Sequence, residues 1–177
     1  MLTKIRSLLL GLSLITVAGL LALYLYVQMG KGEAIFGGSD GTLPPTDFAS
    51  LIHPSGDNGY LLCPTELCSN AEADGPAPLF EVGATILRQA IVDFTDDMPT
   101  IRTHRFDIRT SQFDFLERLP GEHLPTVISI RVLPDTAYTS RLAIYCTKPI
   151  GDIGRESHSE RVERWVRLIG SRLNSAQ

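Results

Sequence analysis

The sequence predicts an α+β protein with one N-terminal transmembrane helix, followed by an antiparallel four-stranded sheet flanked by two helices in the order αββββα. Three patterns predict it: an uncharged apolar run near the N-terminus, period-two alternation after residue 100, and a helical period on either side of that alternation. A chain of 177 residues has room for one domain and an appendage. We expect an anchor over residues 1–30, a flexible linker over 31–59 and an extracytoplasmic domain over 60–175.

The apolar run covers residues 7–29 and carries no charge for 23 residues. A helix of this length, rising about 1.5 Å per residue, spans the roughly 30 Å hydrocarbon core of a bilayer. A cleaved signal peptide is the alternative, but its apolar part is typically about 7–15 residues and ends in small residues, which are missing here. A buried core helix is the other alternative, and it is usually shorter.

Basic residues set the expected orientation of this segment. Lys4 and Arg6 precede it, and only Lys31 comes closely after it, which favours a cytoplasmic N-terminus. The sequence therefore predicts a single-pass protein of the bacterial inner membrane, with the membrane as partner of residues 7–29 and a periplasmic C-terminal domain.

Charge and composition constrain the exported part. Without Lys4 and Arg6 it holds 14 basic and 20 acidic residues, a formal net charge of −6. We expect no nucleic-acid partner, because such domains are usually basic. Residues 32–59 contain six glycines and three prolines without an apolar period, as expected of a linker.

A first helix is predicted near residues 83–95. Its apolar side chains recur at helical spacing on one face: Leu87, Ala90, Ile91 and Phe94. A second helix should begin at Ser157, which with Glu160 forms a capping box. Its predicted buried stripe is Val162, Trp165, Val166, Ile169 and Leu173. Two i,i+4 pairs, Glu160 with Arg164 and Glu163 with Arg167, are expected on its exposed side.

Four strands are predicted between the helices, because apolar and polar residues alternate there. They lie near residues 100–108, 112–118, 127–133 and 139–146. If the last two pair with residue numbers that sum to 272, Arg131 stands opposite Arg141. With Phe115 beside Ile130 in the neighbouring strand pair, Asp114 lies beside Arg131 and neutralises the like charges. The alternative is an anion-binding face formed by Arg118, Arg131 and Arg141.

Cys63 and Cys68 are five residues apart around a proline. A zinc site needs four ligands, and the four histidines are scattered singly, so no metal is expected. The spacing is also wrong for a Cys-x-x-Cys redox centre. In an oxidising compartment a disulfide is favoured, with two free thiols as the alternative. Cys146 is expected to be a small buried apolar residue.

No motif for a nucleophile with a base, and none for phosphate binding, is found. We expect no cofactor and no catalytic residue. His158 is expected to be exposed to solvent in the first turn of the last helix. The alternative is an enzyme, which would require Asp152, His158 and Arg161 to converge in a concave site.

Several segments in order carry a resemblance to a known family: YLLCPTELC, QFDFLER, PTVISIRVLP and SRLAIYCTKPIGDIGRESHSERVERW. Together they resemble the bacterial and plastid proteins grouped as domain of unknown function 1499. The likeness runs from about Gly59 to Leu173. It implies an anchored or exported small domain and no particular activity.

The family's closing pattern is only partly matched. Its turn and end correspond to Gly151, Asp152, Gly154, Arg161 and Val162. Cys146 and Lys148 stand where the family usually has Ser and Arg, and His158 stands for Asn if two residues are inserted.

Taken together, the sequence predicts a membrane-anchored extracytoplasmic protein that is a non-catalytic binding or envelope-structural module. The alternative is an envelope enzyme, hydrolase-like, that uses the turn region Gly151–Arg161. The binding residues proposed from sequence are Arg118, Arg131, Arg141, Asp152, His158 and Arg161.

Overall fold

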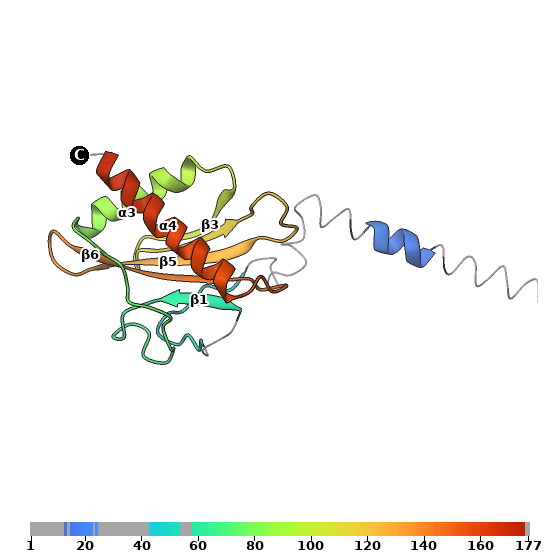
Figure 1. Cartoon of the computed structure of the whole chain (residues 1–177), viewed down its shortest axis with the longest axis horizontal. Helices are drawn as coiled ribbons and strands as arrows, with labels where there is room; N and C mark the ends of the chain where they lie inside the picture. Colours follow the sequence, from blue (N-terminus) through green and yellow to red (C-terminus); the bar gives the residue numbers. More distant parts are fainter. Residues whose placement is uncertain (1–12, 14, 23, 25–42, 54–57, 176–177) are drawn as a thin grey trace, which may run out of the picture. The chain divides into compact units, whose positions relative to one another are not determined.

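A computed structural model describes residues 13, 15–22, 24, 43–53 and 58–175 of the chain (Figure 1). The chain divides into two compact units, residues 1–44 and 45–177. In the first unit the described residues 13, 15–22 and 24 are helical. The second unit holds the sheet and both remaining helices.

The second unit is built on one six-stranded antiparallel sheet. Its strands are β1 (Gly59–Leu62), β2 (Leu79–Phe80), β3 (Ile101–Asp107), β4 (Gln112–Glu117), β5 (Thr126–Pro134) and β6 (Ser140–Thr147). They lie in the order β1-β6-β5-β4-β3, and β2 pairs with the start of β6. The four strands β3 to β6 form a meander, in which each strand pairs with the next along the chain.

The predicted fold class is wrong in two respects, although the fold is α+β. The sheet has six strands rather than four, because β1 and β2 add to the outer edge of β6. These two strands are four and two residues long, too short to show an alternating pattern. Pairing with β6 defines them, and such a long-range contact leaves no local signal.

The predicted transmembrane helix is the second correction. Within residues 13, 15–22, 24, 43–53 and 58–175, no helix is long and apolar enough to cross a membrane. The rest of the segment 7–29 lies outside the described residues, as do residues 31–42 and 54–57 of the expected linker.

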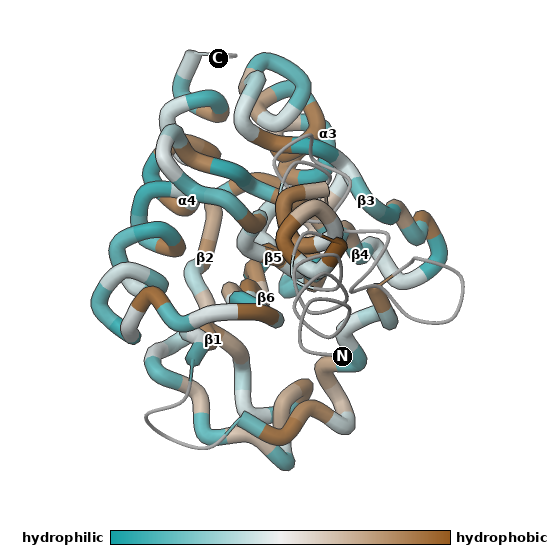
Figure 2. Tube along the Cα trace, turned by 90° about the vertical axis from the view of Figure 1, so that its right-hand side faces the viewer, coloured by the Kyte–Doolittle hydropathy of each residue, from teal (hydrophilic) through white to brown (hydrophobic). Residues whose placement is uncertain are grey.

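Two helices, α3 (Ala84–Asp96) and α4 (Arg155–Ser175), cover one face of the sheet (Figure 1). Apolar side chains of both helices and of alternate residues in β4, β5 and β6 form the main core. Trp165 lies at its centre and contacts Phe94 and Phe115 through ring centroids 5.1 and 5.4 Å away. Hydrophilic residues run along the outer side of α4 (Figure 2). Burial of one helical stripe therefore holds α4 on the sheet.

The helix α4 begins at Arg155, before the predicted capping box. Its first turn includes a hydrogen bond from the His158 amide to the Gly154 carbonyl at 3.3 Å. Ser157 is thus inside the helix, and the prediction that it caps the helix is wrong. Arg164 also pairs with Glu117 rather than with Glu160, whereas Glu163 and Arg167 lie 3.7 Å apart.

The strand register differs from the prediction by two residues. Arg131 pairs with Ala143 rather than with Arg141, and Leu133 stands opposite Arg141. Asp114 likewise pairs with Ser129 rather than with Arg131. Asp114 contacts Arg105 instead, at 3.4 Å. A shift of two keeps every side chain on its predicted face and changes only its neighbours, because the side-chain period of a strand is two.

The second face of the sheet is partly covered by residues 45–53, which we call the strap, and residues 63–75, which we call the disulfide loop. A disulfide joins Cys63 and Cys68 within this loop. Phe48 of the strap packs with both cysteines, Leu61 and Ala143 in a second small core. Residues 45–53 of the expected linker therefore belong to the compact unit.

Asp74 ties the strap, the disulfide loop, β1 and α4 together. Its carboxylate accepts a hydrogen bond from the Leu61 amide at 2.7 Å, contacts His53 Nε2 at 2.9 Å and pairs with Arg155 at 2.5 Å. The Asp74 side chain is only 2% exposed. A buried carboxylate is stable only when such partners compensate for lost hydration.

Replacing Asp74 with Ala should lower the free energy of unfolding by about 3 kcal/mol, because it leaves His53, Arg155 and the Leu61 amide without their acceptor. Urea unfolding of the full chain, followed by the fluorescence of the single Trp165, measures this change. Asp135→Ala is the matched control, because the Asp135–Arg141 pair is exposed and should contribute about 0–1 kcal/mol. Equal losses in the two variants would refute the role of Asp74.

Candidate functional site

Polar side chains gather at one end of the helix-covered face of the sheet. In β4 the buried row Phe113 and Phe115 continues to Glu117, which is 3% exposed. In β6 the row of Leu142 and Ile144 continues to Cys146 and, just past the strand, to Lys148. Because alternate residues share a face, these polar groups point toward α4 rather than toward solvent. They meet its first turns, where His158 and Arg161 are also buried.

Five charged side chains form what we call the charge cluster: Glu117, Glu122, Lys148, Arg161 and Arg164. Arg161 lies at its centre and donates to Glu117 at 2.9 Å and to Glu122 at 2.6 Å. Arg164 pairs with Glu117 at 2.8 Å, and Lys148 lies 3.7 Å from Glu122. The cluster thus holds three cations and two carboxylates. Burial makes the remaining positive charge more effective than the same charge in water.

The shifts in the pKa values of Arg161 and Glu122 agree with this arrangement. Burial disfavours the charged form of Arg161, but the hydrogen bond to Glu122 and the charge of Glu117 outweigh it and raise the pKa of Arg161. Burial also opposes ionisation of Glu122. The Leu119 amide and Arg161 prevail and lower the pKa of Glu122. Both groups are therefore charged at neutral pH.

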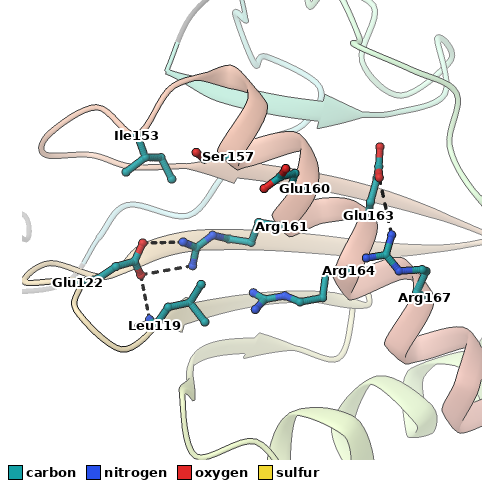
Figure 3. Close-up of a pocket in the computed structure, with 9 residues that line it drawn as sticks. All are labelled: Leu119, Glu122, Ile153, Ser157, Glu160, Arg161, Glu163, Arg164 and Arg167. Atoms are coloured by element: carbon teal, nitrogen blue, oxygen red, sulfur yellow. Dashed lines mark hydrogen bonds and ion pairs between the residues drawn. The ribbon is translucent and has the colours of Figure 1, made fainter.

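An open pocket of about 560 Å³ lies beside the cluster, and we call it the α4 pocket (Figure 3). It is lined by Leu119, Glu122, Ile153, Ser157, Glu160, Arg161, Glu163, Arg164 and Arg167. Arg161, Arg164 and Arg167 succeed one another along α4, and Glu122 faces Arg161 from the loop after β4 (Figure 3). Only 5% of the Arg161 side chain is exposed, against 34% of Arg164 and 69% of Arg167. The arginines thus form a series from the pocket wall to the solvent.

Next to the charge cluster, Asn58, His158 and Cys146 form a hydrogen-bonded chain. Asn58 Nδ2 donates to the carbonyls of Lys148 and Gly151, at 2.9 and 2.6 Å, so Asn58 Oδ1 is the atom that faces His158 Nε2 at 2.8 Å. His158 Nε2 therefore carries the hydrogen and donates a hydrogen bond to Asn58 Oδ1. His158 Nδ1 is left as the acceptor for the Cys146 thiol, whose sulfur lies 3.2 Å away.

The hydrogen-bonded chain of Asn58, His158 and Cys146 has the arrangement of a cysteine nucleophile with its base and an orienting amide. Its protonation states, however, are unfavourable for nucleophilic attack. Cys146 and His158 are both fully buried. Burial raises the pKa of Cys146 to about 12. Burial and the charge of Arg161 lower the pKa of His158. Neutral thiol and neutral imidazole are thus the stable pair, whereas a reactive cysteine needs a thiolate that can be reached.

The structure separates the residues proposed from sequence. Arg131 stands opposite Gln112 at one end of β4, whereas Arg118 comes directly after the other end. Arg141 pairs with Asp135 at 3.2 Å. These arginines therefore do not assemble one anion-binding face.

The three residues of the predicted turn site each have separate partners. Asp152 is exposed and accepts from the Gly154 amide at 2.7 Å. His158 contacts Cys146 and Asn58, and the expectation that it is solvated is wrong. Arg161 contacts Glu117 and Glu122. The side chains of Asp152, His158 and Arg161 make no hydrogen bond to one another within the described part of the chain.

Sequence reasoning missed five members of the site: Asn58, Glu117, Glu122, Lys148 and Arg164. A signal for the buried face was present. His158 and Arg161 stand four residues before Val162 and Trp165, which belong to the predicted stripe. The same helical period therefore places both on the inner side of α4. The alternation of β4 similarly extends from Phe113 and Phe115 to Glu117. Asn58 and Glu122 lie in loops and leave no such signal.

The chain matches no known protein-family model and no curated protein. The resemblance to domain of unknown function 1499 therefore stays a prediction. Among residues 13, 15–22, 24, 43–53 and 58–175, no group of three or more His, Cys, Asp or Glu side chains is placed to hold a metal ion.

Replacing His158 with Asn should weaken the pH dependence of stability below about pH 6.5. The lowered pKa of His158 means that the unfolded chain takes up a proton near pH 6.5 while the folded chain does not. Stability of the wild type therefore falls as the pH drops below 6.5. Arg161 and Lys148 oppose protonation in the fold, and Asp152 and Glu122 favour it.

The measurement is the unfolding free energy at several pH values, and the slope decides the outcome regardless of the variant's absolute stability. His123→Asn removes a solvent-exposed histidine and is the control. An unchanged slope in His158→Asn would show that other groups cause the pH dependence.

Proposed function

We propose that this chain is an extracytoplasmic, non-catalytic binding module that associates with the bacterial inner membrane through residues 7–29 and takes its ligand in the α4 pocket. Its domain belongs on the periplasmic side. The observation that carries the binding site is Arg161, a buried arginine in the pocket wall, within a cluster of three cations and two carboxylates.

The disulfide supports a location outside the cytoplasm. Cys63 and Cys68 are buried together beneath the strap, where their bond fixes the disulfide loop next to Phe48. Disulfides of this structural kind form and persist in oxidising compartments and are rare in the cytosol. The distribution of Lys4, Arg6 and Lys31 around the apolar segment agrees with export of the C-terminal domain.

The chemistry of the α4 pocket favours binding over catalysis. Its arginines offer fixed positive charge and directed N–H donors, which suit recognition of an anionic group. Glu122 is ionised, so it is a poor proton donor at neutral pH. Cys146 and His158 have the geometry of a nucleophile and a base, but they are sealed in the core with the thiol protonated. The hydrolase-like alternative in the region Gly151–Arg161 therefore has less support than binding.

The location is tested by differential alkylation of the full chain, taken from the cells that express it. After denaturation without reductant, the thiol of Cys146 should react with iodoacetamide, and Cys63 and Cys68 should react only once the chain is reduced. Cys146 is the internal control, because it is the free cysteine of the fold. Mass spectrometry of the peptides reads the outcome, and alkylation of Cys63 and Cys68 before reduction would contradict the periplasmic location.

The binding site is tested by placing a photoreactive amino acid at Ser157, an exposed residue that lines the α4 pocket. Irradiation of living cells should attach a ligand or partner there, detected as a mass increase of the purified full chain. Ser171, also exposed on α4 but outside the pocket lining, is the matched position. Arg164→Gln should reduce the adduct at Ser157. Equal labelling at both positions, or none at Ser157, would overturn the proposed site.

A further inference from the structure

We infer that the ligand of the α4 pocket binds through a carboxylate group, and that this group displaces Glu122 from Arg161. Glu122 would then be an internal competitor that occupies the anchor point until the ligand arrives. The inference rests on the proposed function and specifies its ligand class.

The two carboxylates of the charge cluster differ in how they are held. Glu117 belongs to β4, is 3% exposed and is shared between Arg161 and Arg164. Glu122 belongs to the loop between β4 and β5 and lines the pocket, with 17% of its side chain exposed. Gly121, just before it, has a positive φ of 88°. Strand pairing fixes the backbone of Glu117, and two arginines hold its carboxylate. The carboxylate of Glu122 is held by Arg161 and by the Leu119 amide of its own loop, and loops are more mobile than the strands they connect.

The contacts of Glu122 define what can replace it. Its Oε1 lies 2.6 Å from Arg161 Nη2, and its Oε2 lies 3.5 Å from Nη1, so both oxygens face the guanidinium fork. Lys148 Nζ approaches Oε1 at 3.7 Å. A planar carboxylate matches this fork, and the protein's own side chain already occupies the position in that geometry (Figure 3).

Arg161 has hydrogen-bonding capacity that the fold leaves unused. Its Nε is buried and has no hydrogen-bond partner among the described residues, and the same is true of the hydroxyl oxygen of Thr126, the cross-strand neighbour of Glu117. Buried polar groups are usually satisfied, so the unpaired Nε of an arginine in the pocket wall points to a role beyond stability. Arg161 also keeps its bond to Glu117 when Glu122 leaves, so displacement does not strand a buried charge without any partner.

Displacement has a quantitative consequence. The internal carboxylate lowers the apparent affinity for a ligand in proportion to the time it occupies Arg161. Removing it also raises the excess positive charge of the cluster from one to two. Glu122→Ala should therefore bind a small carboxylate more tightly than the wild type does, by about tenfold or more, which corresponds to ~1.4 kcal/mol.

The experiment is equilibrium dialysis of the purified full chain against radiolabelled propionate, which reproduces the side chain of glutamate. The wild type, Glu122→Ala and Glu163→Ala are compared. Glu163 lines the same pocket and carries the same charge, but it contacts Arg167 instead of the charge cluster, so its removal controls for net charge. Glu122→Gln is a second variant that removes the charge while retaining an amide oxygen for the Leu119 amide.

The inference holds if Kd falls about tenfold or more in Glu122→Ala, falls in the same direction in Glu122→Gln, and changes less than about twofold in Glu163→Ala. It fails if Glu163→Ala tightens binding as much as Glu122→Ala, because the effect is then one of net charge. It also fails if no variant binds propionate, or if all bind it equally. Inorganic phosphate is the comparison probe, and preference of Glu122→Ala for phosphate over propionate would overturn the carboxylate class.

Failure of this inference can be distinguished from failure of the proposed function. An adduct at Ser157 with no effect of Glu122 would retain the α4 pocket as the site and remove only the internal competitor. Loss of the adduct would remove the site itself, whatever the affinity for propionate.

Discussion

The buried guanidinium of Arg161 constrains how the helical layer meets the sheet. An arginine placed on the inner side of α4 loses most of its hydration, and the structure compensates with two carboxylates from elements far away in the sequence. Glu117 supplies one from the end of β4, and Glu122 supplies the other from the loop after it. The first turns of α4, the end of β4 and this loop must therefore assemble together.

The same end of the fold contains two groups of buried polar side chains, one charged and one neutral. The charge cluster keeps Arg161 and Glu122 ionised, because each has an oppositely charged partner within reach. The chain of Asn58, His158 and Cys146 stays neutral, because burial disfavours both the thiolate and the imidazolium. Arg161 contributes to both, since its positive charge lowers the pKa of His158 while it attracts Glu122. A charged anchor beside a neutral hydrogen-bonded chain suits recognition of an anion better than proton transfer.

Periodicity predicts the parts of the fold that depend on a single element. The helix near residues 83–95 is α3, and four of the five residues in the predicted stripe of the last helix are buried. The strands β3 to β6 lie where apolar and polar residues alternate. The predicted stripe nevertheless contains apolar residues only. Extending it back by one turn reaches His158 and Arg161, so the inner face of α4 is visible in the sequence although its charge chemistry is not.

The remaining features depend on contacts between distant residues. A register shift of two leaves the hydrophobic pattern unchanged, so no pattern distinguishes the pairing of Arg131 with Ala143 from its pairing with Arg141. Strand β1 and the strap have no strong local preference; β6, the disulfide and Asp74 hold them in place. Asn58 acquires its role only because the chain returns to it at His158, 100 residues later.

Arg131 and Arg161 illustrate why charge in a sequence does not identify a site by itself. Both are arginines among apolar residues, and the sequence nominates both as binding residues. Arg131 lies on the second face of the sheet, where Gln112 and Ala143 are its strand neighbours. Arg161 lies in the wall of a pocket and pairs with Glu122, a loop residue whose side chain is partly exposed. Lys148 lies 3.7 Å from the same carboxylate. An anion-binding site requires both fixed positive charge and access for the ligand. Among the arginines proposed from the sequence, only Arg161, in the wall of the α4 pocket, combines the two.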